Sequence, residues 1–190
     1  MAILVRTLNT ERYKVRENHF RGLVGSIISQ QLSVKAAETI RNRFVRVLGS
    51  KTFTHKHILQ TPFKKLRLAG ISGSKVQFIK DLAKAMELKK LNFRKIQQMD
   101  DEQVIEALTE FKGVGRWTAE MFLIFSLNRP DVFSLGDGGL KNAIIKIYKP
   151  KNHNPQTFLR IAQKWQPYRS IASIYLWASL DKNKRNNNLS

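Results

Sequence analysis

The stretch FKGVGRWTA, residues 111–119, joins two segments with helical periodicity and decides the fold. Two glycines that flank one aliphatic residue allow a very tight turn, because Gly113 can adopt a positive φ at a helix end and Gly115 leaves room at the next helix start. We expect Val114 to be buried between the two helices. The N–H groups at the second helix start then face outward, in front of the positive end of the helix dipole, and form a phosphate site. An ordinary helix cap and turn is the alternative.

Nearly every periodic stretch of the chain repeats apolar residues at intervals of three and four, which is typical of helices. Residues 20–48 form two such segments that divide near residues 31–33, where Ser33 can cap the second helix. The segment after Gly115 is apolar almost all round, so we expect it in the middle of the fold. There is no strand-like alternation of useful length. The sequence therefore predicts an all-α fold of roughly ten helices.

Capping residues and prolines predict where the other helices begin. The expected starts lie at Ser72 or Ser74, at Asp100 or Asp101, at Asp137, and near Pro155 and Pro167. Residues 181–190 form a polar tail.

The charge balance points to a polyanionic partner. There are 34 Lys and Arg against 14 Asp and Glu, a formal net charge of +20. Such an excess repels itself in a compact protein and usually persists because a polyanion neutralises it. Nucleic acid is the first candidate and an anionic membrane surface the second, while a lysine-rich proteome or plain solubility would explain the charge without a partner.

The chain contains no cysteine, which excludes disulfides, thiolate zinc sites and cysteine-ligated iron–sulfur clusters. We expect no required cofactor. The apolar run at the N-terminus is too short for a signal peptide, and no segment approaches the about 20 apolar residues of a membrane span. We therefore expect no membrane partner and a location in the cytoplasm or nucleoid, or in the nucleus of a eukaryote. We also expect a monomer.

A second informative segment, SLGDGGLK, covers residues 134–141 and places Asp137 at the start of a helix. The hairpin and Asp137 together resemble the helix-hairpin-helix DNA glycosylase superfamily, whose hairpin runs Leu-Pro-Gly-Val/Ile-Gly and whose later "GPD" segment supplies a catalytic Asp. Within it the chain most resembles 3-methyladenine DNA glycosylase II, the bacterial and yeast alkylation-repair enzymes. Three further stretches support the resemblance in the family's order: IISQQLS with Ala36 and Ala37, LAGIS with Lys75, and residues 165–177 from WQPYRS to YLW.

The chain departs from the family pattern at a few positions. Phe111 and Lys112 occupy the Leu-Pro places of the hairpin, Gly136 lies where the family usually has Pro, and Gly138 lies close to a family Leu. A more flexible backbone beside Asp137 can alter the reaction rate or the range of substrates. The chain also begins almost directly at the helical core, so we expect the N-terminal β-domain of longer relatives to be absent.

The resemblance implies that Asp137 is the catalytic carboxylate. As the bond between the sugar C1′ and the base breaks, positive charge grows on the sugar, and a fixed carboxylate beneath it stabilises that state and orients water. An N-cap is the alternative role of Asp137, and the two are compatible, because capping keeps the carboxylate ionised. Glu120 is the first rival for the catalytic role, although we expect it to have an Arg or Lys partner; Asp131 is the other acid near the hairpin.

The resemblance also implies the type of reaction and the base pocket. In family members that nick the backbone, the position of Trp117 holds a lysine that forms a Schiff base, which an indole cannot do. We therefore expect a monofunctional enzyme that leaves an abasic site. Trp117 and Trp177 match pocket aromatics, and an indole face attracts a cationic methylated purine by about 0.5–2 kcal/mol. Met121 lies one turn beyond Trp117; core packing is the alternative for all three.

The expected partner is double-stranded DNA with a damaged base. The hairpin residues expected to bind it are Lys112, Gly113, Val114, Gly115, Arg116 and Thr118. Base extrusion needs a wedge, for which Gln31 and Leu32 are the candidates; a plain helix turn with Leu32 buried is the alternative. Lys141 and Arg169 are candidate phosphate contacts, although either can be a solvated charge and Arg169 can instead pair with a core carboxylate. In the family, hairpin carbonyls also hold a monovalent cation such as Na⁺ or K⁺; by position these belong to Thr109, Phe111 and Val114.

The expected organisation is a two-lobed one. Residues 1–32 with 136–180 would form a lobe of N- and C-terminal helices, and residues 33–135 a helical barrel that carries the hairpin at 111–117. The alternative functions are a glycosylase for oxidised or mismatched bases, whose lysine and cysteine-ligated cluster are missing here, and a non-catalytic hairpin module. The module explains the charge and the hairpin but not Asp137.

Overall fold

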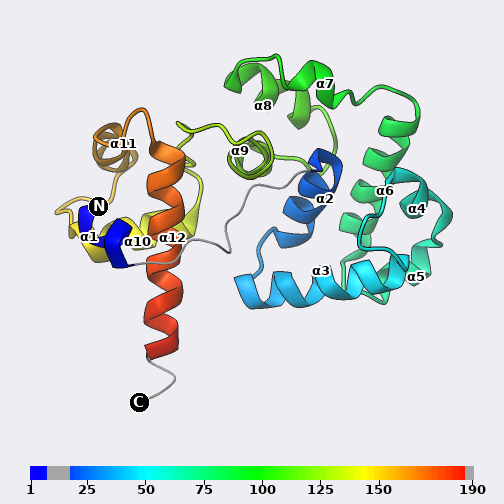
Figure 1. Cartoon of the computed structure of the whole chain (residues 1–190), viewed down its shortest axis with the longest axis horizontal. Coiled ribbons are helices and arrows are strands. Elements are labelled where there is room, and N and C mark those ends of the chain that lie inside the picture. The colour runs from blue at the N-terminus through cyan, green and yellow to red at the C-terminus, as the bar shows by residue number, and fades with distance from the viewer. Residues whose placement is uncertain (8–17, 187–190) are drawn as a thin grey trace. The chain divides into compact units, whose positions relative to one another are not determined.

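The computed structural model describes residues 1–7 and 18–186, and all regular elements within these residues are helices (Figure 1). The described helices are α1 (Ala2–Thr7), α2 (His19–Ser29), α3 (Val34–Leu48), α4 (His55–Gln60), α5 (Phe63–Arg67), α6 (Gly73–Glu87), α7 (Phe93–Ile96), α8 (Asp101–Thr109), α9 (Arg116–Phe125), α10 (Gly138–Tyr148), α11 (Pro155–Gln163) and α12 (Arg169–Asn186). The prediction of an all-α fold is confirmed. In the part of the chain described, no helix is both long and apolar enough to cross a membrane.

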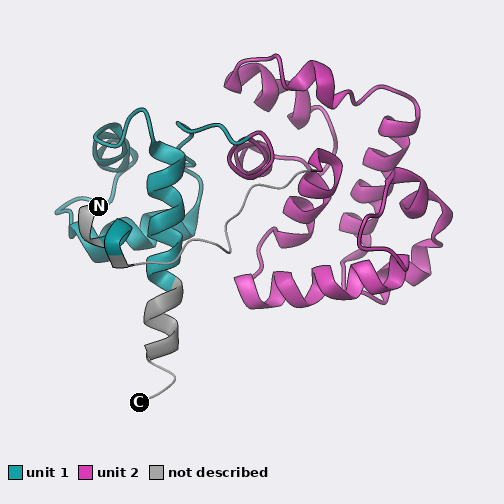
Figure 2. Ribbon diagram, viewed as in Figure 1, with its two compact units in different colours: residues 1–15, 128–190 teal, residues 16–127 magenta. Residues whose placement is uncertain are grey.

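The chain divides into two compact units (Figure 2). Unit 1 comprises residues 1–15 and 128–190, and unit 2 comprises residues 16–127. This division differs from the expected lobes, because α2 belongs to unit 2, where it packs against α3, α6 and α9. Burial of seven consecutive α2 residues, from Gly22 to Ile28, explains this placement. Residues 8–17, in the expected first lobe, lie outside the described residues.

Unit 2 is built around α2 and α9, which pack against each other. Helix α9 is buried continuously from Thr118 to Ile124, which confirms its predicted place in the middle of its part of the fold. The Phe122 ring stacks on Phe93 at 5.6 Å between centroids and meets the edge of the His19 ring at 5.9 Å. Burial lowers the pKa of His19, although the pairing with the Ser126 backbone raises it in part.

Helix ends in unit 2 follow the predicted capping residues. The hydroxyls of Ser33 and Ser72 accept backbone N–H groups at the starts of α3 and α6, both at 3.3 Å. Asp100 caps α8 in a reciprocal capping box with Gln103. Because the caps satisfy helix-end N–H groups locally, these boundaries could be predicted from sequence alone.

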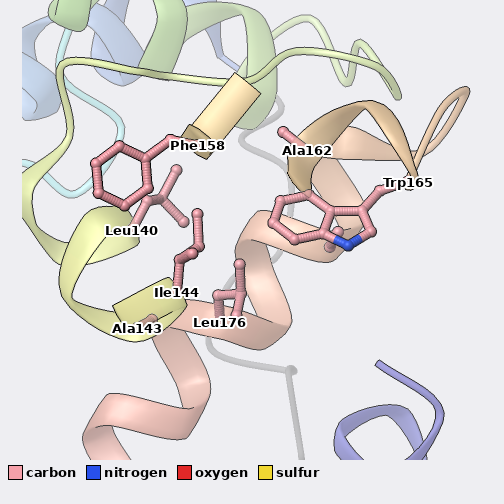
Figure 3. Packing of buried hydrophobic residues seen from close by; sticks show 8 residues of the cluster. Leu140, Ala143, Ile144, Phe158, Ala162, Trp165 and Leu176 are labelled. Atoms are coloured by element: carbon pink, nitrogen blue, oxygen red, sulfur yellow. The ribbon is translucent and has the colours of Figure 1, made fainter. Parts of the chain in front are cut away.

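In unit 1, α10, α11 and α12 share one hydrophobic cluster (Figure 3). Its buried members are Leu140, Ala143, Ile144, Phe158, Ala162, Trp165, Ala172 and Leu176. Helix α12 continues to Asn186, so residues 181–186 of the expected polar tail are helical, while residues 187–190 lie outside the described residues. The polar composition of that stretch gives no apolar periodicity from which a helix could be predicted.

The hairpin between α8 and α9 has the predicted backbone geometry. Gly113 has φ +87°, and Val114 is buried, with its N–H donating to the Phe111 carbonyl at 2.9 Å. A Cβ at position 113 would lie 2.1 Å from the Phe78 ring of α6, so both the backbone and the packing require glycine there. Gly115 forms the N-cap of α9 with nothing within 4 Å of a Cβ, which leaves open space at the helix start, as expected.

We expect Gly113→Ala to destabilise the protein more than Gly49→Ala. Both glycines have positive φ, +87° and +70°, but only Gly113 is packed against a side chain, while a Cβ at Gly49 meets nothing within 4 Å. Backbone strain alone costs an alanine about 1 kcal/mol, and overpacking adds about 1–3 kcal/mol. Urea unfolding of both variants measures the difference; equal losses would contradict the packing of Phe78 against the hairpin.

Candidate active site

The Asp137 carboxylate is held at the start of α10 by two N–H donors from different helices. Its Oδ1 accepts the Leu140 backbone N–H at 2.7 Å and the Trp177 indole N–H at 3.0 Å. Asp137 is therefore the N-cap of α10, as the capping alternative expected, and only 8% of its surface is exposed. The indole comes from α12, so the carboxylate is fixed by both the chain near it and a residue far along the sequence.

One glycine, Gly139, lies close to the carboxylate. A Cβ at Gly139 would lie 3.0 Å from Asp137 Oδ1 and 3.3 Å from the Trp177 ring, so glycine lets the indole approach the carboxylate closely. By contrast, a Cβ at Gly136 or Gly138 would meet nothing within 4 Å. At these two positions, where the chain departs from the family pattern, packing therefore does not require glycine.

The segment that leads to Asp137 is attached to the start of α12 through Asp131. The Arg169 Nε and Nη2 donate to Oδ1 and Oδ2 of Asp131 at 2.8 and 3.0 Å, and Nη2 also donates to the Asp131 carbonyl at 2.9 Å. The next residue, Ser170, donates its backbone N–H to the Pro130 carbonyl and accepts the Val132 N–H. Hydrogen bonds from Arg169 lower the pKa of Asp131.

This pairing corrects one predicted role. Arg169 was expected to contact phosphate, with a carboxylate partner as the alternative, and the structure shows the carboxylate partner. A bidentate guanidinium–carboxylate pair is a strong and directional contact, so the Arg169 side chain positions a loop inside unit 1. Lys141, the other phosphate candidate, lies half-buried in the first turns of α10.

At the hairpin, Arg116 is bound by two carboxylates. Its Nε donates to Glu120 at 3.1 Å, and its Nη1 and Nη2 donate to Glu102 at 3.0 and 2.6 Å. The predicted basic partner of Glu120 is thus Arg116. The exposed Arg116 side chain is therefore engaged within unit 2, and its contact with DNA stays a prediction. The hydrogen bond with Arg116 lowers the pKa of Glu102, and the same bond raises the pKa of Arg116.

The other hairpin side chains divide into exposed and buried ones. Lys112 is exposed, as a phosphate contact must be, while only 1% of Thr118 is exposed. The Thr118 hydroxyl accepts a hydrogen bond from the Gln30 amide at 2.8 Å, so its side chain is part of the interior and not a DNA contact. The carbonyls of Thr109, Phe111 and Val114 remain the predicted cation ligands. Backbone oxygens suit a hard cation, although the Phe111 oxygen also accepts the Val114 N–H.

The wedge candidates are at the exposed turn between α2 and α3. Gln31 has φ +57° and is exposed, and 37% of Leu32 is exposed, so the alternative in which Leu32 is buried was wrong. Gln30 and Lys75, which the sequence motifs contained without an assigned role, bond to the backbone around this turn and to the hairpin. Nothing local in the sequence indicates these bonds, because their partners lie 45 or more residues apart.

The predicted pocket residues are placed within their own units. Trp117 and Met121 lie on α9 in unit 2, the first half-buried and the second buried, and Trp177 lies half-buried on α12 in unit 1. The burial of Met121 agrees with the core-packing alternative. The indole N–H of Trp177 is used by Asp137, while its ring also packs against the cluster of unit 1.

Comparison with known proteins gives one family match and two similar relatives. A family model described as "HhH-GPD superfamily base excision DNA repair protein" matches residues 24–167. The chain is 33% identical over 177 residues to DNA-3-methyladenine glycosylase 1 of Schizosaccharomyces pombe, covering 92% of this chain and 78% of that protein. It is 36% identical over 163 residues to the alkylbase DNA glycosidase-like protein mag2 of the same yeast, covering 83% of this chain and 76% of that protein.

Among solved structures, the chain resembles the S. pombe 3-methyladenine DNA glycosylase Mag1 in complex with abasic DNA. The TM-score is 0.81 at 33% sequence identity, over 93% of this chain and 87% of that chain.

We expect Asp131→Asn to weaken the dependence of the free energy of unfolding on pH in the acid range. Because the pKa of Asp131 is lowered in the folded state, its ion pair stabilises the protein above the ordinary pKa of 3.8, and this stabilisation is lost as the pH falls through the folded-state pKa. The variant should unfold more easily at pH 7, by about 1–2 kcal/mol, and should lose less stability than the wild type between pH 5 and pH 2. Urea unfolding at several pH values measures both effects; parallel profiles would contradict the role of the pair.

Proposed function

The chain belongs to the HhH-GPD superfamily of base excision DNA repair proteins, and we propose that it hydrolyses the N-glycosidic bond of alkylated bases in duplex DNA, with Asp137 as the catalytic carboxylate. Relatives named DNA-3-methyladenine glycosylase and alkylbase DNA glycosidase-like protein support alkylated bases as the substrate class. The observation that carries the catalytic proposal is the Asp137 carboxylate held by the Leu140 and Trp177 N–H groups.

The reaction needs a fixed anion more than a strong acid. A purine methylated at a ring nitrogen, such as 3-methyladenine, is cationic while it is bonded to the sugar, so it takes the electron pair of the C1′–N bond and leaves as a neutral base. Positive charge meanwhile grows on the sugar, and the Asp137 carboxylate stabilises it. Water then bonds to C1′ and releases one proton, which the carboxylate or solvent accepts. The two N–H donors on Oδ1 keep the carboxylate oriented during these steps, so little reorganisation accompanies the reaction.

We expect the enzyme to be monofunctional. A glycosylase that also nicks the strand needs an amine to form a Schiff base with the sugar, and residue 117, the family position of that amine, is a tryptophan. The product would then be an intact strand with an abasic site. Favourable interaction of an indole face with a cationic base, worth about 0.5–2 kcal/mol, supports Trp117 and Trp177 as base-pocket residues.

DNA binding by the hairpin would depend on backbone more than on side chains. Because the side chains of Arg116 and Thr118 make hydrogen bonds within unit 2, the backbone N–H groups at the start of α9 and the exposed Lys112 are the first candidates for phosphate ligands in the hairpin. The net charge of +20 supports attraction to DNA at longer range. A Na⁺ or K⁺ on the hairpin carbonyls would add positive charge at the same place. We expect the protein to act as a monomer within the cell.

We expect Asp137→Asn to lose at least about 100-fold in the single-turnover rate of base release. Asparagine can still cap α10, because its side-chain oxygen accepts the same N–H groups, so the loss reports the missing charge. The assay incubates methylated duplex with the protein and detects abasic sites by heat or alkali cleavage, alongside a DNA-binding measurement that should change little.

Asp100→Asn is the matched control. It makes the same substitution at another helix N-cap, where the side chain accepts the Gln103 N–H at 2.9 Å. Its rate should stay within about twofold of the wild type, since Asn and Asp cap helices comparably. If Asp137→Asn releases bases like the wild type, the catalytic proposal is wrong.

A further inference from the structure

The exposed turn between α2 and α3 is connected to the hairpin by side-chain bonds within unit 2. Helix α2 ends at Ser29, and the chain then passes through Gln30 to the exposed apex formed by Gln31 and Leu32. The last carbonyls of a helix have no partners within that helix. The groups that bond to them therefore fix how the chain leaves α2 and where the apex lies.

Lys75 bonds to these carbonyls. Its ammonium group donates to the Ile28 oxygen at 3.1 Å and to the Gln30 oxygen at 2.7 Å. Both bonds join α6 to the end of α2, where the helix dipole also favours a positive charge. Burial of the amine lowers the pKa of Lys75.

Gln30 connects the same turn to the hairpin. Its side-chain nitrogen donates to the Gly113 carbonyl and to the Thr118 hydroxyl, each at 2.8 Å. A primary amide has two N–H donors, so both are used on the hairpin. One residue thus presents its backbone oxygen to Lys75 and its side chain to the hairpin. The apex lies one residue further along the chain.

We propose that Gln30 and Lys75 are positioning residues for base extrusion, which fix the Gln31–Leu32 apex relative to the phosphate-binding hairpin. This inference rests on the proposed function. The hairpin sets the register of the protein on the strand without reading bases, and a wedge must enter the base stack at a set distance from that phosphate. A rigid link between the two gives the apex that distance before DNA arrives.

The proposal predicts that the variants lose excision rate to an extent that depends on how the damaged base is paired. In a normal duplex, extrusion breaks a base pair and the apex must fill the gap, so a misplaced apex slows excision. Opposite an abasic site the same damaged base has no pair to break, and the apex matters less. A variant that is only less stable loses active enzyme equally on both substrates. The ratio of the two rates therefore separates positioning from folding.

The test uses Lys75→Met and Gln30→Leu, with Lys80→Met as the matched control. Lys80 lies on the same helix and donates in the same way to the Ile58 and Leu59 carbonyls near the end of α4, at 3.2 and 3.3 Å. Single-turnover excision is measured for one alkylated base in a fully paired duplex and opposite an abasic site. We expect the paired-to-unpaired rate ratio to fall about tenfold or more in Lys75→Met and Gln30→Leu, and to stay within about twofold of the wild type in Lys80→Met. Binding of undamaged duplex should change little in all three.

The outcomes are distinguishable. If the two variants keep the wild-type ratio, or if Lys80→Met lowers it as much, the positioning role is wrong while the proposed function stands. If Lys75→Met fails to fold, Gln30→Leu decides by the same ratio. Should the wild type release no alkylated base from either substrate, the proposed function fails and this inference fails with it.

Discussion

Hydrolysis of the glycosidic bond that joins a cationic base to its sugar requires one negative group. This group must stay in place while positive charge moves from the base to the sugar. In the proposed reaction that group is Asp137, whose Oδ1 is held by a backbone N–H of α10 and by the indole N–H of Trp177 on α12. N–H donors at a helix start stabilise a negative carboxylate and restrict its rotation. Helices α10 and α12, which carry these donors, pack against each other within unit 1.

Helix α12 contributes at two points along its length. At its start, Arg169 and Ser170 bind the Pro130–Val132 segment, and two turns later Trp177 binds Asp137 itself. The cluster of apolar side chains shared with α10 and α11 fixes α12 against the helix that Asp137 caps. In unit 2 the corresponding structural link is made by Gln30 and Lys75, which connect an exposed turn, the hairpin and α6. In each unit, hydrogen bonds between residues far apart in the sequence therefore hold the candidate functional groups in place.

What could be predicted from the sequence was local. Ser33, Ser72, Asp100 and Asp137 cap helices as predicted, because a cap and its N–H partner are three residues apart. The hairpin geometry followed from two glycines and the residue between them. Side-chain partners 38 or more residues away, such as the Asp131 partner of Arg169 or the Gly113 partner of Gln30, leave no such signal. The same limitation explains the placement of α2, since an apolar helix face indicates burial without indicating which neighbour covers it.

The central claim is that Asp137 stabilises positive charge on the sugar, and the most direct measurement compares DNA affinities. A duplex that carries a cationic azasugar in place of the damaged nucleotide mimics the charged sugar, and one that carries a neutral tetrahydrofuran has nearly the same shape. We predict that the wild type binds the cationic duplex at least about 100-fold more tightly, as expected of a transition-state mimic, and that Asp137→Asn loses this preference. Equal affinities in the wild type, or an undiminished preference in Asp137→Asn, would contradict the account.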